Sequence, residues 1–156
     1  MSELAESKMT NFFDQLFKNC DCPIKYHDHD VWRGIYDYSH HEWFEGQQCF
    51  DGEISISSLL PSEGKEGTLT HEIGHHRHHK HIGTDKYEAT NLIAREIIAE
   101  LYALHLLLKN KRKEALKYRF STYKEFWENS YEHAEALKVI KCRRIWKRCE
   151  QFLKEG

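Results

Sequence analysis

The stretch that decides the fold is TLTHEIGHHRHHKHIG, residues 68–83, which contains the pentapeptide HEIGH at 71–75. On a helix, residues four apart lie on one face, so His71 and His75 can direct two imidazoles at one point. Zinc binds imidazole nitrogens at about 2.0–2.1 Å, and a catalytic zinc site keeps one position open for water. Glu72, beside the first histidine, is placed to accept a proton from that water. The motif therefore predicts a helix that carries a metal site and a general base.

Cap and turn signals predict where this helix begins and ends. Thr68 is a suitable N-cap residue, and Gly83 is a suitable C-terminal stop. The preceding segment SEGKEG, residues 62–67, is expected to be a loop. Gly74, inside the motif, omits a side chain where the helix would need to approach another element closely.

Length and composition favour one globular domain over residues 1–156. Hydrophobic residues make up 40% of the chain, which is enough for a core, and only 2 prolines and 8 glycines favour a helix-rich protein. We expect an N-terminal helix and irregular region over 1–51, a core over 52–110 and a basic helical region over 111–156. Every apolar run is shorter than the ~20 residues that span a membrane, and the acidic start is unlike a secretory signal, which predicts a cytoplasmic protein.

Hydrophobic spacing predicts a small sheet beside several helices. Apolar residues predict a helix over 8–17, while the stretch 22–50, rich in His and aromatic residues, is expected to form strands and loops. GEISISSLLP, residues 52–61, alternates isoleucine with serine and predicts a short half-buried strand. A second long helix is expected over 84–109, and one or two further helices over 111–153.

Two glutamates fall on the apolar face of the helix expected over 84–109. The apolar residues that define this face are Ala89, Leu92, Ile93, Ile97, Leu104 and Leu107. Glu96 and Glu100 lie on the same face, and carboxylates are rarely buried unless they are paired or bind a metal. We therefore expect Glu96 to be the third metal ligand and Glu100, one turn further, to accept the outer ring N–H of a ligand histidine. The alternative is that Arg95, His105 or lysines neutralise these acids.

The five cysteines stand at irregular positions: Cys20, Cys22, Cys49, Cys142 and Cys149. An odd number in a cytosolic chain predicts free thiols rather than a disulfide framework. Zinc binding by Cys20 and Cys22 stays open, although the CxxC pairs typical of such sites are missing. Helical spacing predicts an apolar, buried stripe formed by Cys142, Ile145, Cys149 and Phe152.

Further histidines follow the motif, namely His76, His78, His79 and His81. They are interpreted as a solvated helix face, with an extension of the metal site as the alternative. An oxyanion formed at a substrate carbonyl needs a stabilising donor. The sequence leaves this role open among His27, His29, His40, His41 and Tyr102.

Charge is distributed unevenly along the chain. Residues 1–100 hold 18 acids against 9 Lys and Arg, a net of −9, whereas residues 101–156 hold 7 acids against 14, a net of +7. The basic excess includes Lys138, Lys141, Arg143, Arg144, Lys147 and Arg148. We expect a solvated surface here, and contact with nucleic acid or an acidic protein is the alternative.

The motif and the acids that follow it resemble the zincins of the glutamate-ligand, thermolysin-like class. In that class HExxH is followed by a helix with the pattern ExxA(D/N), and residues 96–100, EIIAE, match it with Glu in the last place. A closer resemblance is to the ImmA/IrrE-type metallopeptidases, small intracellular enzymes of bacteria, and it covers residues 52–103. The matching runs are Gly52–Ile56, Thr68–His75 and Glu96–Ala103. The chain departs from the family in HHRHHKHIG after the motif and in its C-terminal third.

This resemblance implies an α+β, zincin-like fold, in which a small sheet packs on the HExxH helix and further helices follow. It implies one Zn²⁺ per chain, with Glu72 as general base and Glu100 holding a ligand in place. The metal ligands would be His71, His75 and Glu96.

The resemblance also implies that an extended peptide substrate lies along the strand formed by Ile54, Ser55 and Ile56. The substrate would be an intracellular protein, such as a helix-turn-helix repressor. Two alternatives to an enzyme stay open at this point. One is an inert zincin-fold protein that acts through protein or nucleic-acid contacts of its basic half, and the other is a histidine-rich metal-handling protein.

Overall fold

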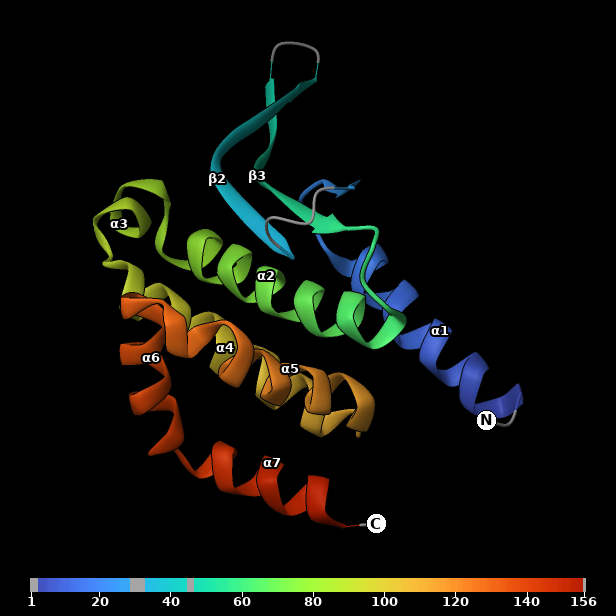
Figure 1. The fold of residues 1–156 in the computed structure, drawn as a ribbon. Helices are drawn as coiled ribbons and strands as arrows, with labels where there is room; N and C mark the ends of the chain where they lie inside the picture. The colour runs from blue at the N-terminus through green and yellow to red at the C-terminus, as the bar shows by residue number, and fades with distance from the viewer. Residues whose placement is uncertain (1–2, 29–32, 45–46, 156) are drawn as a thin grey trace.

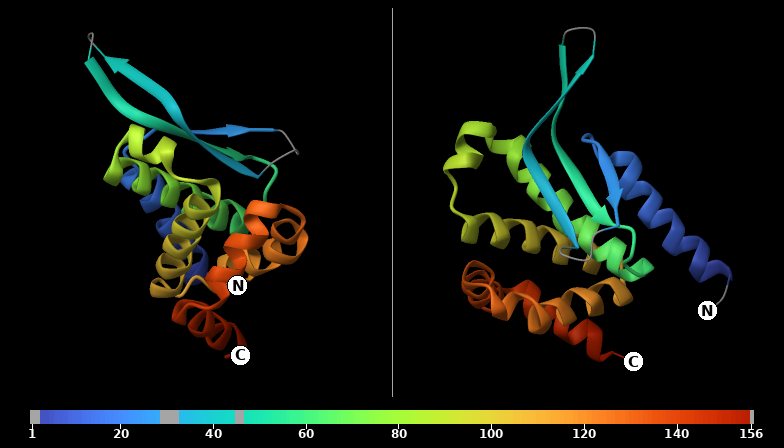
Figure 2. Two further views of the ribbon diagram at one scale, coloured as in Figure 1. Left: turned by 90° about the vertical axis from the view of Figure 1, so that its left-hand side faces the viewer. Right: turned by 45° about the horizontal axis from the view of Figure 1, so that its top comes forward.

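The computed structural model describes residues 3–28, 33–44 and 47–155, and for residues 3–10, 40–44 and 47–51 only the backbone is considered. The described chain forms an α+β fold in which a three-stranded sheet lies along one long helix, with further helices on the opposite side (Figures 1 and 2). This arrangement confirms the predicted zincin-like fold class. The elements are α1 (Glu3–Asn19), β1 (Ile24–His27), β2 (Gly34–Phe44), β3 (Gln47–Ser57), α2 (Ser62–Ile82), α3 (Thr84–Ala89), α4 (Leu92–Lys109), α5 (Lys113–Glu125), the 3-10 helix η1 (Trp127–Asn129), α6 (Tyr131–Lys141) and α7 (Arg144–Lys154).

The sheet has the strand order β1-β3-β2, with β1 parallel and β2 antiparallel to β3. The strand predicted from alternating isoleucines is therefore the central one, and it is paired on both sides. Ile54 and Ile56 are fully buried and pack with Leu69 and Ile73 of α2. The prediction that Ile54, Ser55 and Ile56 form an open edge for a substrate is wrong, because the backbone groups of β3 are already paired with β1 on one side and with β2 on the other. The edge beside α2 is β2.

Helices α2 and α4 approach each other closely, and Gly74 makes this possible. A Cβ at Gly74 would lie 2.6 Å from the carbonyl oxygen of Ala99 and 2.8 Å from the Cα of Ala99. The close approach predicted for this glycine is confirmed, and it brings the acidic face of α4 against the HEIGH turn of α2.

The C-terminal helices share a core with α4 on the side away from the sheet. Its buried residues include Leu104, Leu107, Leu116, Trp127, Ile140 and Cys149. This core fixes η1 and the start of α6 next to the HEIGH turn.

Helix α2 begins earlier than predicted. SEGKEG is not a loop but the first turns of α2, and Thr68 is buried inside the helix rather than at its cap. The reason is packing: a Cβ at Gly64 would lie 3.0 Å from the Tyr118 ring, and one at Gly67 would lie 3.1 Å from Arg119 Cδ. These glycines allow α5 to approach α2 closely. They are therefore sites of helix packing and do not form a turn. Gly83, with φ +87°, ends the helix as expected.

The single helix expected over 84–109 is two helices, broken at Thr90 and Asn91. The Asn91 side chain caps α4 by accepting a hydrogen bond from Ala94 N at 2.8 Å. Ala89 and Leu92 therefore do not share the buried face of α4, and Leu92 is 54% exposed.

The region 111–153 also contains more helices than expected, since α5, η1, α6 and α7 all lie within it. Cys142 is exposed, because it falls in the connection between α6 and α7 and not on a continuous helix. Cys149 is buried as predicted. No helix in the described ranges has the length and apolar character needed to cross a membrane.

Candidate metal centre

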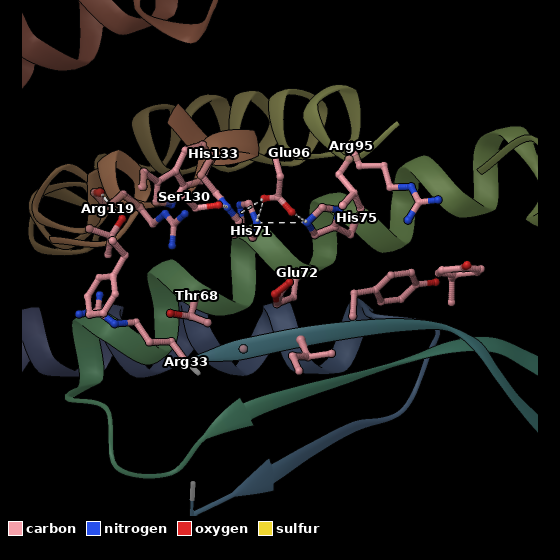
Figure 3. A pocket seen from close by; sticks show the side chains of 18 of the residues that line it. Arg33, Thr68, His71, Glu72, His75, Arg95, Glu96, Arg119, Ser130 and His133 are labelled. Atoms are coloured by element: carbon pink, nitrogen blue, oxygen red, sulfur yellow. Dashed lines mark hydrogen bonds and ion pairs between the residues drawn. The ribbon is translucent and has the colours of Figure 1, made fainter. Parts of the chain in front are cut away.

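The side chains of His71, His75 and Glu96 meet between α2 and α4 (Figure 3). His71 Nε2 lies 3.2 Å from His75 Nε2 and 3.0 Å from Glu96 Oε2, and His75 Nε2 lies 3.1 Å from Glu96 Oε1. Two ligand atoms at 2.0–2.1 Å from a tetrahedral ion are about 3.3 Å apart. The three separations therefore fit one small metal ion, and two imidazoles with a carboxylate are a donor set that suits a catalytic zinc.

Charge and burial favour the ligand state of the carboxylate. Burial opposes ionisation of Glu96, but the imidazoles of His75 and His71 hold the pKa of this carboxyl well below its usual range. Burial acts to lower the pKa of His71, but Glu96 and Glu100 outweigh it and raise this pKa to about 10. The carboxylates of Glu96 and Glu100 therefore favour positive charge at His71.

Glu100 lies one turn beyond Glu96 and is fully buried. Its carboxylate accepts two hydrogen bonds from Arg119 of α5, one from Nε at 3.0 Å and one from Nη2, and its Oε2 lies 3.6 Å from His71 Nδ1. Burial acts to raise the pKa of Glu100, but the Arg119 guanidinium outweighs it and lowers this pKa to about 2. Arg119 replaces the counter-charges that the sequence had suggested, since Arg95 donates instead to the carbonyls of Tyr87 and Glu88.

Two further residues contact the candidate ligands and were missed in the sequence. The Tyr87 hydroxyl of α3 lies 3.1 Å from His75 Nδ1, and His133 Nε2 of α6 lies 3.5 Å from Glu96 Oε2. His133 Nδ1 is 3.0 Å from Ser130 Oγ, so the ring is oriented with Nε2 toward the centre. The sequence offered no signal for either, because each comes from an element whose bounds were not predicted.

Glu72 is buried beside the candidate ligands and directed toward β2 (Figure 3). Burial raises its pKa, and the charges of His71 and His75 act in the opposite direction. Gly34 of β2 lies directly over it, since a Cβ there would be 3.1 Å from Glu72 Cγ and 3.3 Å from Oε2. The missing side chain leaves room for the carboxylate between helix and strand.

These groups line a cleft of about 520 Å³ between β2, α2 and the helices from α3 to α6. Its walls combine polar groups of the centre with apolar and aromatic side chains. The lining residues outside the centre include Ile35, Tyr38, Leu92, Phe126, Trp127 and Ser130.

The other predicted histidines lie in different surroundings. His76 and His79 are buried, and both Nδ1 atoms contact the Tyr36 hydroxyl, at 2.9 and 2.6 Å. They therefore belong neither to a solvated face nor to the metal centre. His78 is half-buried and packs edge-on against Tyr87, whereas His81 is exposed.

The candidates for an oxyanion donor lie elsewhere. Tyr102 lines a separate cavity with Arg77 and Cys20, and His27 belongs to β1, at the edge of the sheet opposite the cleft. His29 and the side chains of His40 and His41 lie outside the described residues. The predicted basic residues between Lys138 and Arg148 are all exposed on α6, α7 and their connection.

Comparison with known proteins identifies the family of the chain. Residues 23–139 match the family model Peptidase_M78, described as the IrrE N-terminal-like domain. No curated protein and no solved structure matches the chain. The matched segment holds 117 of the 156 residues and includes the whole centre, from β2 to His133. It confirms the resemblance drawn from the HEIGH and EIIAE runs, and the chain belongs to the M78 peptidase family.

Proposed function

We propose that this protein is a zinc-dependent peptidase that hydrolyses a peptide bond of a protein substrate. The observation that carries the proposal is the set of ligand-atom separations of 3.0–3.2 Å among His71, His75 and Glu96, with Glu72 beside them in an open cleft. A zinc ion held there would polarise the substrate carbonyl and make water a stronger nucleophile at neutral pH. The family supports a peptidase, and the donor set supports zinc as its metal.

Glu72 is proposed as the general base. Its buried carboxylate lies between α2 and β2 and lines the same cleft as His71 and His75, where it can accept a proton from attacking water and return it to the leaving amine. Burial raises its pKa toward neutrality, which makes both transfers easier than for an ordinary glutamate.

His133 is proposed to stabilise the oxyanion formed at the substrate carbonyl. Its Nε2 faces the centre because Nδ1 is engaged with Ser130, and the side chain is 37% exposed and lines the cleft. A donor that is fixed before the reaction costs no reorganisation when charge develops.

We propose that the substrate pairs with β2, and not with β3 as the sequence suggested. The Arg33 carbonyl accepts a hydrogen bond from Ser57 N at 2.8 Å, and Ile35 is paired with Ser55. Because backbone groups alternate in direction along a strand, those of Gly34 face the open edge above the cleft. An extended peptide can add there as a further strand, with its backbone passing Glu72.

The substrate class remains the one implied by the family resemblance, a protein such as a helix-turn-helix repressor. The exposed basic residues of α6 and α7 support a salt-sensitive contact with a DNA-bound or acidic target. A neighbouring repressor that is neither bound nor cleaved at low salt would remove this substrate and leave the peptidase proposal intact.

The test of the proposed activity is Glu72→Gln. The amide keeps the shape of the side chain but cannot accept the proton, so we expect zinc content to stay the same and peptide hydrolysis to fall by about 10²–10⁴-fold. Zinc is measured by elemental analysis, and cleavage is measured with an unfolded protein substrate such as casein. Glu88→Gln, at an exposed position of α3, is the matched control. Equal cleavage by the Glu72→Gln variant and the wild type would remove Glu72 from the mechanism, and inactivity of the zinc-loaded wild type would favour an inert binding protein.

A further inference from the structure

A pair of cysteines lies where α1 ends and β1 begins, apart from the cleft. Cys20 Sγ and Cys22 Sγ are 3.5 Å apart, and only Asp21 separates them in the chain. Both are free thiols; Cys22 is buried and Cys20 is half-buried. Cys20 lines a cavity of about 290 Å³ together with Arg77 and Tyr102. A small molecule can therefore reach the Cys20 thiol through this cavity. The Cys22 thiol is buried next to it.

The two thiols differ in their readiness to ionise. The side-chain hydrogen bond with Cys22, aided by a backbone hydrogen bond from Cys22 and by the Lys80 ammonium, outweighs burial and lowers the pKa of Cys20 to about 7. The same hydrogen bond, together with burial, raises the pKa of Cys22. An accessible thiolate next to a protonated thiol is the arrangement found in cysteines that react with peroxides.

The pair does not look like a metal site. In the parts of the chain that the structure describes, a metal-ligand group of three or more residues forms at His71, His75 and Glu96, and Cys20 and Cys22 have no such third partner. The zinc site that the sequence left open for these cysteines therefore receives no support.

We infer that Cys20 and Cys22 are a redox modification site, at which a hydroperoxide converts the two thiols into an intramolecular disulfide. The Cys20 thiolate attacks the peroxide, so the O–O bond breaks, a Cys20 sulfenic acid forms and the leaving alkoxide or hydroxide takes a proton. Cys22 then attacks Cys20 Sγ and expels hydroxide, which leaves as water with the Cys22 proton. Two thiols and one hydroperoxide thus give one disulfide, one alcohol or water, and one further water. The two electrons lost by sulfur reduce the peroxide.

The first step prepares the second. The hydrogen bond with the Cys20 thiolate raises the pKa of Cys22 and keeps this thiol protonated. When the sulfenic acid forms, the thiolate is gone, so Cys22 can lose its proton more easily and attack. Closing the bond shortens the Sγ–Sγ separation from 3.5 Å to about 2.05 Å.

The site also touches the helix that carries the metal ligands. Asp21, between the two cysteines, pairs with His76 and Lys80 of α2. His76 directly follows the candidate ligand His75. The cysteine pair is therefore connected, through Asp21 and His76, to the turn of α2 that belongs to the candidate centre.

The test uses the full-length, zinc-loaded protein treated with hydrogen peroxide and then alkylated under denaturing conditions. We expect an intact mass with two fewer alkylated thiols and two fewer hydrogen atoms. Cleavage before aspartate separates the peptides 14–20 and 21–27, each of which contains one cysteine of the pair. A disulfide keeps these two peptides joined until a reductant is added. Oxidation of Cys20 to sulfinic acid while Cys22 is still alkylated would overturn the inference, as would a disulfide between chains.

Two variants make the test specific. Cys22→Ser removes the second thiol, so the sulfenic acid of Cys20 should persist and react with dimedone. Cys142→Ser removes the exposed, unpaired Cys142 and should leave the product and the rate unchanged. In the wild type, we expect the pair to be oxidised severalfold faster than Cys142. Equal rates at the two places would show that exposure alone governs the reaction and would contradict the proposal.

Discussion

Helix α2 carries two pairs of histidines, His71 with His75 and His76 with His79. The pairs are adjacent in sequence but lie in different surroundings. His71 and His75 face α4, where the carboxylate oxygens of Glu96 lie 3.0 and 3.1 Å from their Nε2 atoms. His76 and His79 face β2, where the Tyr36 hydroxyl contacts both rings. All four side chains are buried, so burial does not separate the pairs.

The difference lies in which ring nitrogen is used by the protein. In the first pair the outer Nδ1 atoms face Tyr87 and Glu100, so both Nε2 atoms are left to point at one position beside Glu96. In the second pair Nδ1 contacts Tyr36, and Nε2 contacts Asp21 in one ring and Thr84 in the other, the latter at 2.8 Å. A ring whose two nitrogens are engaged with protein groups has none left for an ion. The identity of the neighbours, rather than the number of histidines, therefore distinguishes the two pairs.

The largest effect expected from this comparison is that of Glu96→Ala. The substitution removes the carboxylate that faces the first pair, and we expect zinc affinity to fall by well over the ~100-fold that loss of a supporting contact causes. The rise in thermal stability that zinc gives to the wild type should disappear, because a ligand stabilises only a state that binds it. Affinity is measured by competition with a chelator.

The other acids of this region are the controls for that measurement. Glu88 is exposed on α3, so Glu88→Ala should be nearly silent, and Glu100→Ala should weaken binding less than Glu96→Ala. A protein that keeps zinc after Glu96→Ala but loses it after either of the other two changes would disprove the assigned ligand.

The second effect concerns Glu100, which joins His71 to Arg119. Glu100→Ala should lower zinc affinity about 10–100-fold. It should also lower the free energy of unfolding by about 3–5 kcal/mol, since the Arg119 guanidinium is left buried without its partner. Chemical denaturation of the metal-free protein measures the second quantity separately from the first.

Glu66 offers a matched control, because it forms a similar buried pair with Arg112 away from the centre. Arg112 donates to its two oxygens at 2.6 and 3.0 Å. Glu66→Ala should destabilise the fold without changing zinc affinity. Equal losses of affinity in both variants would mean that Glu100 acts through stability alone.

The sequence predicted the first pair of histidines better than the second for a physical reason. HExxH spacing and helix geometry are local, so they assign His71, Glu72 and His75 to one turn without knowledge of the rest of the chain. Glu96 followed from a mismatch between an acid and an apolar face, and α4 places it at the predicted position even though Leu92 and Ala89 of that face are exposed.

What the sequence could not give were contacts made across long separations. The role of Arg119 depends on Gly64 and Gly67, whose meaning as points of close approach shows only once α5 is seen beside α2. In the same way, Tyr36 engages His76 and His79 because β2 lies along α2, and strand pairing decides that β3 is central. Alternating isoleucines predict a half-buried strand and do not say which strand has the open edge.

The third effect is on pH dependence. Glu96 and Glu100 raise the pKa of His71 to about 10 against the effect of burial, so in the metal-free protein this ring is protonated at neutral pH. Zinc must displace that proton, and a rise in pH therefore strengthens binding, by about tenfold per pH unit below pH 10. Calorimetry in buffers of different ionisation enthalpy should detect about one released proton at pH 7. An affinity that does not change between pH 7 and pH 9 would contradict the protonated state of His71.

A smaller effect is expected from Tyr87→Phe. The change removes the hydroxyl that lies 3.1 Å from His75 Nδ1 and keeps the ring that packs against His78 and His79. We expect a loss of zinc affinity near the lower limit of about tenfold for a supporting contact. Tyr102→Phe, in a separate cavity, is the control and should leave affinity unchanged. An equal change in the two variants would indicate a general effect of losing a tyrosine.

The smallest effect on metal binding is expected from the second pair itself. His79→Gln removes an imidazole that contacts Tyr36 and Thr84, and the loss of two hydrogen bonds should lower the free energy of unfolding by about 1–3 kcal/mol. Zinc affinity should stay within about twofold of the wild type, because both nitrogens of this ring are used by the protein. Elemental analysis should find one tightly held ion per chain in both proteins. Two ions in the wild type that resist mild chelation, with one of them lost in His79→Gln, would make the second pair a metal site and would favour a metal-handling protein. A single ion per chain in both proteins would instead show that His76 and His79 have a structural role, through their contacts with Tyr36, Asp21 and Thr84.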